Sequence, residues 1–175
     1  MSNNCSSKFR KLNANEIECR AARVTEKGVQ ILLYKTARAD QQILDETVGP
    51  MNWEKTYSVM GERLYCTISI WDGEKQAWVS KTDVGTESNT CAEKGAASDA
   101  QKRAATAWGI GRELYTAPMI WIPAEKTSIV ERNGKYYMND ALKVADIRYG
   151  NSGEINYLHI ANRKGASVYA YGSHS

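Results

Sequence analysis

A β-hairpin followed by a short helix is predicted near the N-terminus. After a polar stretch at residues 1–14, two strand-like runs separated by Glu26-Lys27-Gly28 predict a hairpin over residues 16–36, with Gly28 in the turn. The next twelve residues have the spacing of an amphipathic helix that starts after the N-cap Thr36 and stops at Gly49-Pro50. The residues expected on its buried face are Ile43, Leu44, Thr47 and Val48.

Alternation with a period of two predicts an antiparallel meander in the next segment. Three runs, at residues 52–60, 62–72 and 76–85, are separated by Gly-containing turns. In the middle run the apolar positions are Leu64, Cys66, Ile68 and Ile70, and they alternate with Tyr65, Thr67, Ser69 and Trp71. One face of the meander is therefore expected to be buried under the helix that follows.

The stretch CAEKGAASDAQKRAATAWGIGRELY, residues 91–115, predicts one long helix with a spine of small residues. At about 100° per residue, Lys94 and Arg112 both lie roughly 80° to one side of Lys102, and Arg103 lies roughly 100° to the other. The sheet-facing positions are Ala96, Ala100, Ala104, Ala107 and Leu114. A helix with so few large side chains can lie close to a sheet, so its cations would border a groove suited to a polyanion.

The remainder of the chain predicts short strands. Residues 119–123 form an apolar strand, residues 124–140 are polar with a turn at Asn133-Gly134, and three strands follow. These three strands are expected at residues 142–149, 154–161 and 166–171. The predicted class is α+β, with an antiparallel meander packed on a long helix and a small C-terminal β appendix. The expected division is a flexible N-terminus at 1–14, a core domain at 15–122 and the appendix at 123–175.

Composition narrows the choice of function without deciding it. The net charge of +3 is mild, so anion binding has to come from clustered cations. Ten Tyr and five Trp suit half-exposed sheets and subunit contacts, or stacking on bases. Four cysteines without a CxxC pair, and two histidines, argue against a metal site and favour reduced thiols. The N-terminus has no signal-peptide pattern and no apolar run reaches membrane-spanning length, so a cytoplasmic protein is expected.

Three cations, Arg38, Lys81 and Arg103, are candidates for binding an anion, and Arg38 and Arg103 also have a purely structural interpretation. Arg38 lies in the first turn of the short helix, where backbone amides and a guanidinium together can bind phosphate, but a lone Arg there is often incidental. Lys81 ends a strand shortly before the long helix. Arg103 either points into a groove or pairs with a carboxylate such as Asp99, one turn before it.

Catalytic motifs are missing from the sequence. It has no P-loop, no GxSxG, no HExxH and no Asp/Glu-x-Lys nuclease core, and its GxG lies at the end of a helix. His159 alternates with apolar residues in a strand, which favours a structural role. The sequence therefore favours a binding protein that is not an enzyme and needs no cofactor.

Two segments carry a resemblance to a known family. The stretch EKGAASDAQKRAATAWGIGRELY resembles the signature helix of the Rad-fifty-two/twenty-two superfamily of single-strand annealing proteins, with the short phage members of the Sak type most alike. Upstream, ARADQQILDETVGPMNW resembles the family's helix-Gly-Pro-x-Asn-Trp segment, and LYCTISIWDGEKQAWVSKTDVG fills the expected meander. The resemblance covers roughly residues 15–122.

This resemblance implies a β-β-β-α core whose protomers assemble into rings or helical filaments. Single-stranded DNA would lie in a basic groove, held by its backbone, with no nucleotide cofactor. The Lys102-Arg103 pair matches DNA-contacting residues on the signature helix, and Arg38 matches an Arg in phage members. Thr106 stands where eukaryotic members have a further Arg. Lys81, Lys94 and Arg112 are added as DNA contacts from helix and strand geometry.

The resulting hypothesis is a phage protein that anneals complementary DNA strands without ATP during recombination and repair in the host cytoplasm. Implied partners are single-stranded DNA, further copies of the chain, and a single-strand-binding protein or phage exonuclease. The alternatives are a DNA-end-protecting protein that anneals little, and a metal-dependent nuclease whose carboxylates meet only in the fold.

Overall fold

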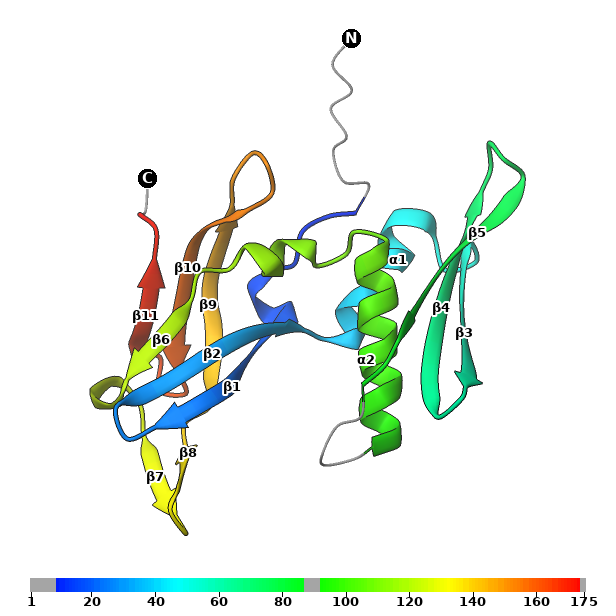
Figure 1. The fold of residues 1–175 in the computed structure, drawn as a ribbon. Coiled ribbons are helices and arrows are strands. Elements are labelled where there is room, and N and C mark those ends of the chain that lie inside the picture. Colours follow the sequence, from blue (N-terminus) through cyan, green and yellow to red (C-terminus); the bar gives the residue numbers. More distant parts are fainter. Residues whose placement is uncertain (1–8, 87–91, 174–175) are drawn as a thin grey trace. The chain divides into compact units, whose positions relative to one another are not determined.

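The structure is a computed structural model that describes residues 9–86 and 92–173, with side chains in the second range from residue 95 onward. It is an α+β chain of mostly antiparallel strands with two α-helices (Figure 1). The helices are α1 (Ala37–Val48) and α2 (Ala92–Ala107), and three short 3-10 helices cover Ala14–Glu16, Arg112–Thr116 and Ala124–Lys126. The strands are β1 (Ile17–Thr25), β2 (Gly28–Lys35), β3 (Trp53–Met60), β4 (Arg63–Asp72), β5 (Ala77–Val84), β6 (Ile120–Pro123), β7 (Ile129–Arg132), β8 (Lys135–Met138), β9 (Leu142–Tyr149), β10 (Ile155–Asn162) and β11 (Ser167–Tyr171).

The described chain divides into two compact units. The first contains residues 9–11 and 36–112, and the second contains residues 12–35 and 113–173. Strands β9 to β11 therefore share a unit, and a sheet, with the N-terminal hairpin β1–β2. This grouping differs from the division expected from the sequence, in which residues 123–175 form a separate appendix. Within the described residues, no helix has the length and apolar character needed to span a membrane.

In the first unit, α2 packs on the three-stranded sheet β3-β4-β5. The alternation in β4 buries Cys66, Ile68 and Ile70, as predicted, whereas Leu64 is half-buried. On the helix, the buried residues are Ala96, Ala100, Gln101, Ala104 and Ala105. The small alanine side chains let the helix backbone approach the end of β5 so closely that a Cβ added at Gly85 would overlap the carbonyl oxygen of Ala96.

The prediction of one continuous helix over residues 91–115 is wrong in its last third. The helix ends in a Schellman motif, with Gly109 at a φ of 103°. The amide of Gly109 donates to Thr106 O at 2.9 Å and the amide of Ile110 donates to Ala105 O at 3.2 Å. Glycine adopts this left-handed conformation without strain, so the chain turns here. Arg112 therefore does not share a helical flank with Lys94 and Lys102, and Leu114 belongs to a separate 3-10 helix.

The turn after α1 explains the Gly-Pro-x-Asn-Trp sequence. Thr36 caps the start of the helix by accepting from Ala39 N at 3.1 Å, as predicted, and Gly49 ends it at a φ of 85°. The side-chain amide of Asn52 donates to Val48 O at 2.8 Å, and the Trp53 indole donates to Asp45 Oδ1 at 2.7 Å. These bonds fix the path from α1 into β3.

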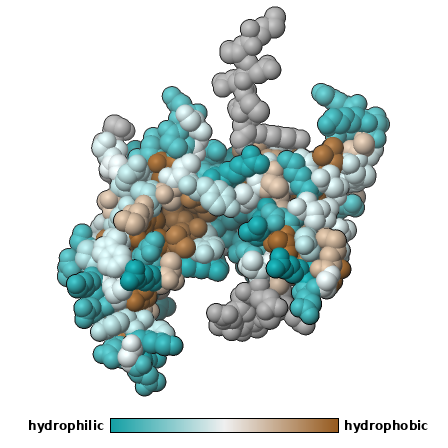
Figure 2. All heavy atoms as spheres, in the orientation of Figure 1, coloured by the Kyte–Doolittle hydropathy of each residue, from teal (hydrophilic) through white to brown (hydrophobic). Residues whose placement is uncertain are grey.

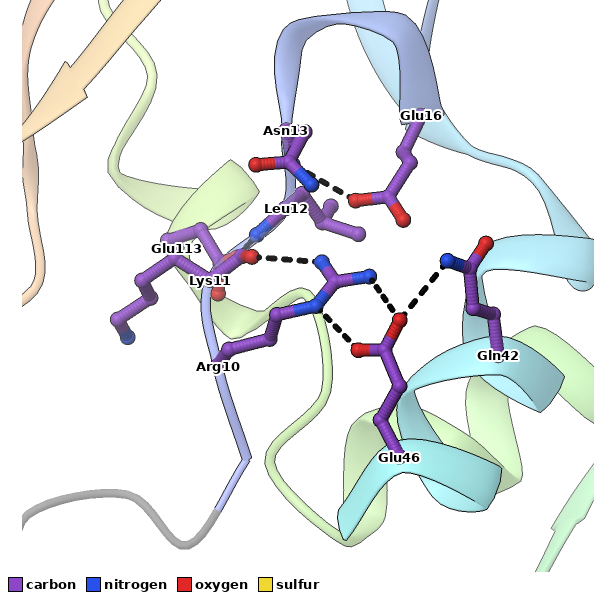
Figure 3. Close-up of polar contacts among 8 residues, drawn as sticks. All are labelled: Arg10, Lys11, Leu12, Asn13, Glu16, Gln42, Glu46 and Glu113. Atoms are coloured by element: carbon purple, nitrogen blue, oxygen red, sulfur yellow. Dashed lines mark hydrogen bonds and ion pairs between the residues drawn. The ribbon is translucent and has the colours of Figure 1, made fainter.

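An ion pair joins residues 9–11 to α1 in the first unit (Figure 3). Arg10 Nε lies 2.6 Å from Glu46 Oε2, and Gln42 Nε2 donates to Glu46 Oε1 at 2.8 Å. The hydrogen bond from Arg10 is the main cause that lowers the pKa of Glu46, followed by the bond from Gln42. In the second unit, Leu12 N donates to Glu113 Oε1 at 2.8 Å, which fixes the start of the segment that leads into β1.

The second unit is a six-stranded antiparallel sheet in the order β11-β10-β9-β1-β2-β6. The sheet curls so that its two edge strands, β6 and β11, lie side by side (Figure 1). Tyr169 Oη in β11 donates to the carbonyl oxygen of Met119, just before β6, at 3.4 Å. A Cβ at Gly28 would lie 2.6 Å from Ile122 O, so glycine is needed where β2 meets β6. Figure 2 shows apolar side chains gathered on one face of this unit. The turn predicted at Asn133-Gly134 joins β7 to β8.

Candidate nucleic-acid interface

Lys102 and Arg103 lie in the second half of α2, which packs on the sheet of the first unit. The neighbouring residues Ala100, Gln101 and Ala104 are buried against the sheet and α1. Lys102 is half-buried and Arg103 is exposed, with 47% of its side chain accessible. A rigid helix therefore presents two adjacent cations at the surface, which is an arrangement suited to contacting a phosphate backbone.

Arg103 forms an ion pair with β5, and its partner differs from the one considered in the sequence. Its Nε lies 3.2 Å from Asp83 Oδ1. Asp99, the expected alternative partner, instead accepts from the amide and hydroxyl of Thr86 at 3.0 and 2.9 Å. Asp83 was not predicted from the sequence as a partner of Arg103. Its alternation with Lys81 along β5 nevertheless indicates that both side chains share the face that packs on α2.

Arg38 is exposed in the first turn of α1. It is brought near α2 through its backbone neighbour, because Gln101 Nε2 donates to Ala37 O at 2.8 Å. Arg38 makes no hydrogen bond or ion pair to any residue that the structure describes. Its guanidinium is thus available to a ligand at the point where α1 begins.

Lys81 and Arg112 meet at the C-terminal end of α2, where the last carbonyls lack helical partners. Lys81 Nζ donates to Ala107 O at 2.8 Å and lies 4.6 Å from the centre of the Trp108 ring. Arg112 donates from Nε to Thr106 O at 2.9 Å and from Nη2 to Ala107 O at 2.8 Å. Cations at a helix C-terminus stabilise it, so both residues have a structural role here that the sequence did not indicate.

Replacing Arg112 with Ala is expected to lower the free energy of unfolding by about 1 kcal/mol, because two charge-assisted bonds to helix carbonyls are lost at an exposed site. Thermal denaturation followed by circular dichroism measures this change. Arg63→Ala, which removes an exposed cation from the start of β4, is the control and should leave the melting temperature nearly unchanged. Equal melting temperatures for both variants would contradict the capping role.

Lys94 lies in the first turn of α2, and its side chain is outside the described part of the structure. No group of three or more His, Cys, Asp or Glu side chains within residues 9–86 and 95–173 is placed to hold a metal ion. Cys19 and Cys66 are free thiols, and burial raises the pKa of Cys19 to about 12.

Two contacts made by cations were not predicted from the sequence. In the first unit, Lys55 on β3 donates to Gln101 Oε1 at 2.9 Å. In the second unit, the exposed Arg20 guanidinium lies 4.9 Å from the ring centre of the exposed Tyr34, on the outer face of the β1–β2 hairpin. A cation over an aromatic ring is also a surface on which nucleic-acid bases stack. Period-two alternation in both strands could have placed these two side chains on one face.

Comparison with known protein families gives a match that covers most of the chain. Residues 6–136 match the family described as Rad52/22 family double-strand break repair protein. The chain belongs to this family. Rad52/22 proteins act in DNA repair, bind single-stranded DNA and form oligomeric rings, and in general they bind and anneal DNA and are not catalytic. Neither a curated protein nor a solved structure matches the chain significantly. The match extends beyond the 15–122 expected from the motifs and includes the β7–β8 hairpin up to Tyr136.

Proposed function

We propose that this Rad52/22 protein binds single-stranded DNA through Arg38, Lys102 and Arg103 and anneals complementary strands without ATP or a metal ion. The observation that carries the proposal is the adjacent cation pair on α2, held at the surface by a helix packed tightly on the sheet. Annealing requires strands to be positioned while base pairing supplies specificity, so fixed cations suffice and no general acid or base is needed.

The other proposed DNA contacts are expected to contribute unequally to DNA affinity. Lys81 and Arg112 already bond to the end of α2, so we expect them to contribute less to DNA affinity than Arg103. Lys94 is proposed as a DNA contact from its helical spacing relative to Lys102. We also propose that the chain is a phage protein of the Sak type that acts in the bacterial cytoplasm as a ring or helical filament. A single-strand-binding protein or a phage exonuclease is its expected partner in recombination.

An annealing assay tests the proposal. Two complementary oligonucleotides, one carrying a fluorophore and the other a quencher, are mixed with the protein in EDTA and without ATP. Faster quenching than in the protein-free reaction is the expected result. Protection of DNA ends from an exonuclease without faster quenching would favour an end-protecting protein, and cleavage that appears on adding Mg²⁺ would favour a nuclease. Either outcome would overturn annealing as the function.

Asp83→Asn is expected to increase affinity for single-stranded DNA. Asp83 holds Arg103 in an exposed ion pair, worth up to about 1 kcal/mol, so its removal should strengthen binding by up to ~5-fold. The amide keeps Oδ1, which accepts from Val84 N at 2.7 Å and from Arg103 Nε at 3.2 Å, so the substitution removes the charge and leaves the acceptor in place. Fluorescence anisotropy of a labelled oligonucleotide at low salt measures the change, which should shrink as salt rises.

The matched control for this prediction is Asp99→Asn. It removes the same charge from the same unit, but Asp99 bonds to Thr86 and not to Arg103. An equal gain in both variants would show that net charge alone is responsible and that the Asp83–Arg103 pair does not compete with DNA.

A further inference from the structure

Gln101 is a buried polar residue whose two amide ends both bond to other elements. The residue is 4% exposed. Nε2 donates to Ala37 O at 2.8 Å, and Oε1 accepts from Lys55 Nζ at 2.9 Å and, at the limit of hydrogen bonding, from Gln41 Nε2 at 3.5 Å. A buried amide with satisfied ends has one orientation, because flipping it would place like groups against both partners.

The bonded partners place this amide next to two of the cations proposed to contact DNA. Ala37 is the first residue of α1 and directly precedes Arg38, while Gln101 directly precedes Lys102 on α2. The bond to Ala37 O therefore ties the backbone at the start of α1 to the middle of α2. Arg38 makes no bond to any described residue, so the position of its backbone is what sets where its guanidinium can reach.

We propose that Gln101, oriented by Lys55, is a positioning residue that fixes the start of α1 so that Arg38 and Lys102 contact the same DNA strand. This inference rests on the proposed function. Gln101 touches neither the DNA nor the guanidinium. It acts through the backbone of Ala37, and Lys55 acts through the orientation of the Gln101 amide.

The test measures affinity for a labelled oligothymidine at several salt concentrations, for Arg38→Ala, Gln101→Leu and the double variant. Loss of one phosphate contact on a single strand lowers the slope of log affinity against log salt by about 0.7. We expect Gln101→Leu to weaken binding several-fold and to lose as much slope as Arg38→Ala. The double variant should bind no worse than Arg38→Ala, because both changes remove the same contact. Gln42→Leu, at an exposed position of α1, is the control and should bind like the unaltered chain.

Two milder variants serve if Gln101→Leu does not fold. Gln101→Glu keeps the size and the acceptor for Lys55 but loses the donor to Ala37 O, and Lys55→Met removes the group that orients the amide. Both should lose slope, whereas Lys55→Arg should restore it. A full salt slope in the variants that fold, or additive losses in the double variant, would overturn the positioning role. If the unaltered chain does not bind the oligonucleotide, the proposed function fails and this inference fails with it.

Discussion

Replacing Lys102 and Arg103 together with Ala is expected to weaken binding to single-stranded DNA by about 100-fold at low salt. Each charge-assisted bond to a phosphate contributes roughly 1.5 kcal/mol, which is about tenfold in affinity. Both side chains project from a helix whose opposite face is buried, so their removal should leave packing intact. The salt slope should also fall by about 1.4, which corresponds to two contacts on a single strand.

Anisotropy titrations with a labelled oligonucleotide measure this loss, and size-exclusion chromatography checks that assembly is unchanged. The matched control is Arg63→Ala with Lys75→Ala, which removes the same two residue types from the start of β4 and from the β4–β5 turn. Arg63 is exposed, and Lys75 is 70% exposed and pairs with Asp72 at 3.5 Å. Net charge falls equally in both double variants. Equal affinities for the two would show that binding depends on overall charge and not on α2.

The order of the first seven main elements could be read from the sequence because each has a local signal. Thr36 and Gly49-Pro50 bound α1, and the alternation around Cys66 and Ile68 identifies the buried face of β4. The end of α2 was harder to predict, because the helical spacing expected from the sequence continues past Gly109 to Leu114. The left-handed backbone conformation of Gly109 ends the helix, and a helical pattern in the sequence does not reveal this conformation. The pairing of β9 with β1 is a long-range contact that has no local signature at all.

The candidate site shows the same division between local and long-range information. Lys102 and Arg103 could be found from the sequence, because adjacent cations on an Ala-rich helix stand out. Asp83 could not be assigned to Arg103, since the choice between it and Asp99 depends on how β5 lies against α2. Lys81 and Arg112 are predicted as DNA contacts from strand and helix geometry, yet both bond to carbonyls that lack helical partners because the helix ends at Ala107.

Gly85→Ala is expected to destabilise the first unit more than any surface change, by about 3 kcal/mol or more, because a backbone atom blocks the added methyl group. Its Cβ would overlap the carbonyl oxygen of Ala96 and lie 3.1 Å from Ala100 Cβ. Neither neighbour is a flexible side chain, so α2 itself has to move away from β5. The shift would displace Lys102 and Arg103 as well, and DNA affinity should fall along with stability.

Gly73→Ala separates this effect from the general cost of replacing glycine with alanine. Gly73 lies in the β4–β5 turn of the same unit, its φ is not positive, and an added Cβ meets nothing within 4 Å. Both substitutions add one methyl group, so they differ in the space available and not in chemistry. Thermal denaturation should therefore give a much lower melting temperature for Gly85→Ala than for Gly73→Ala. Similar melting temperatures would mean that α2 does not lie against the end of β5, and the rigid presentation of its cations would lose its physical basis.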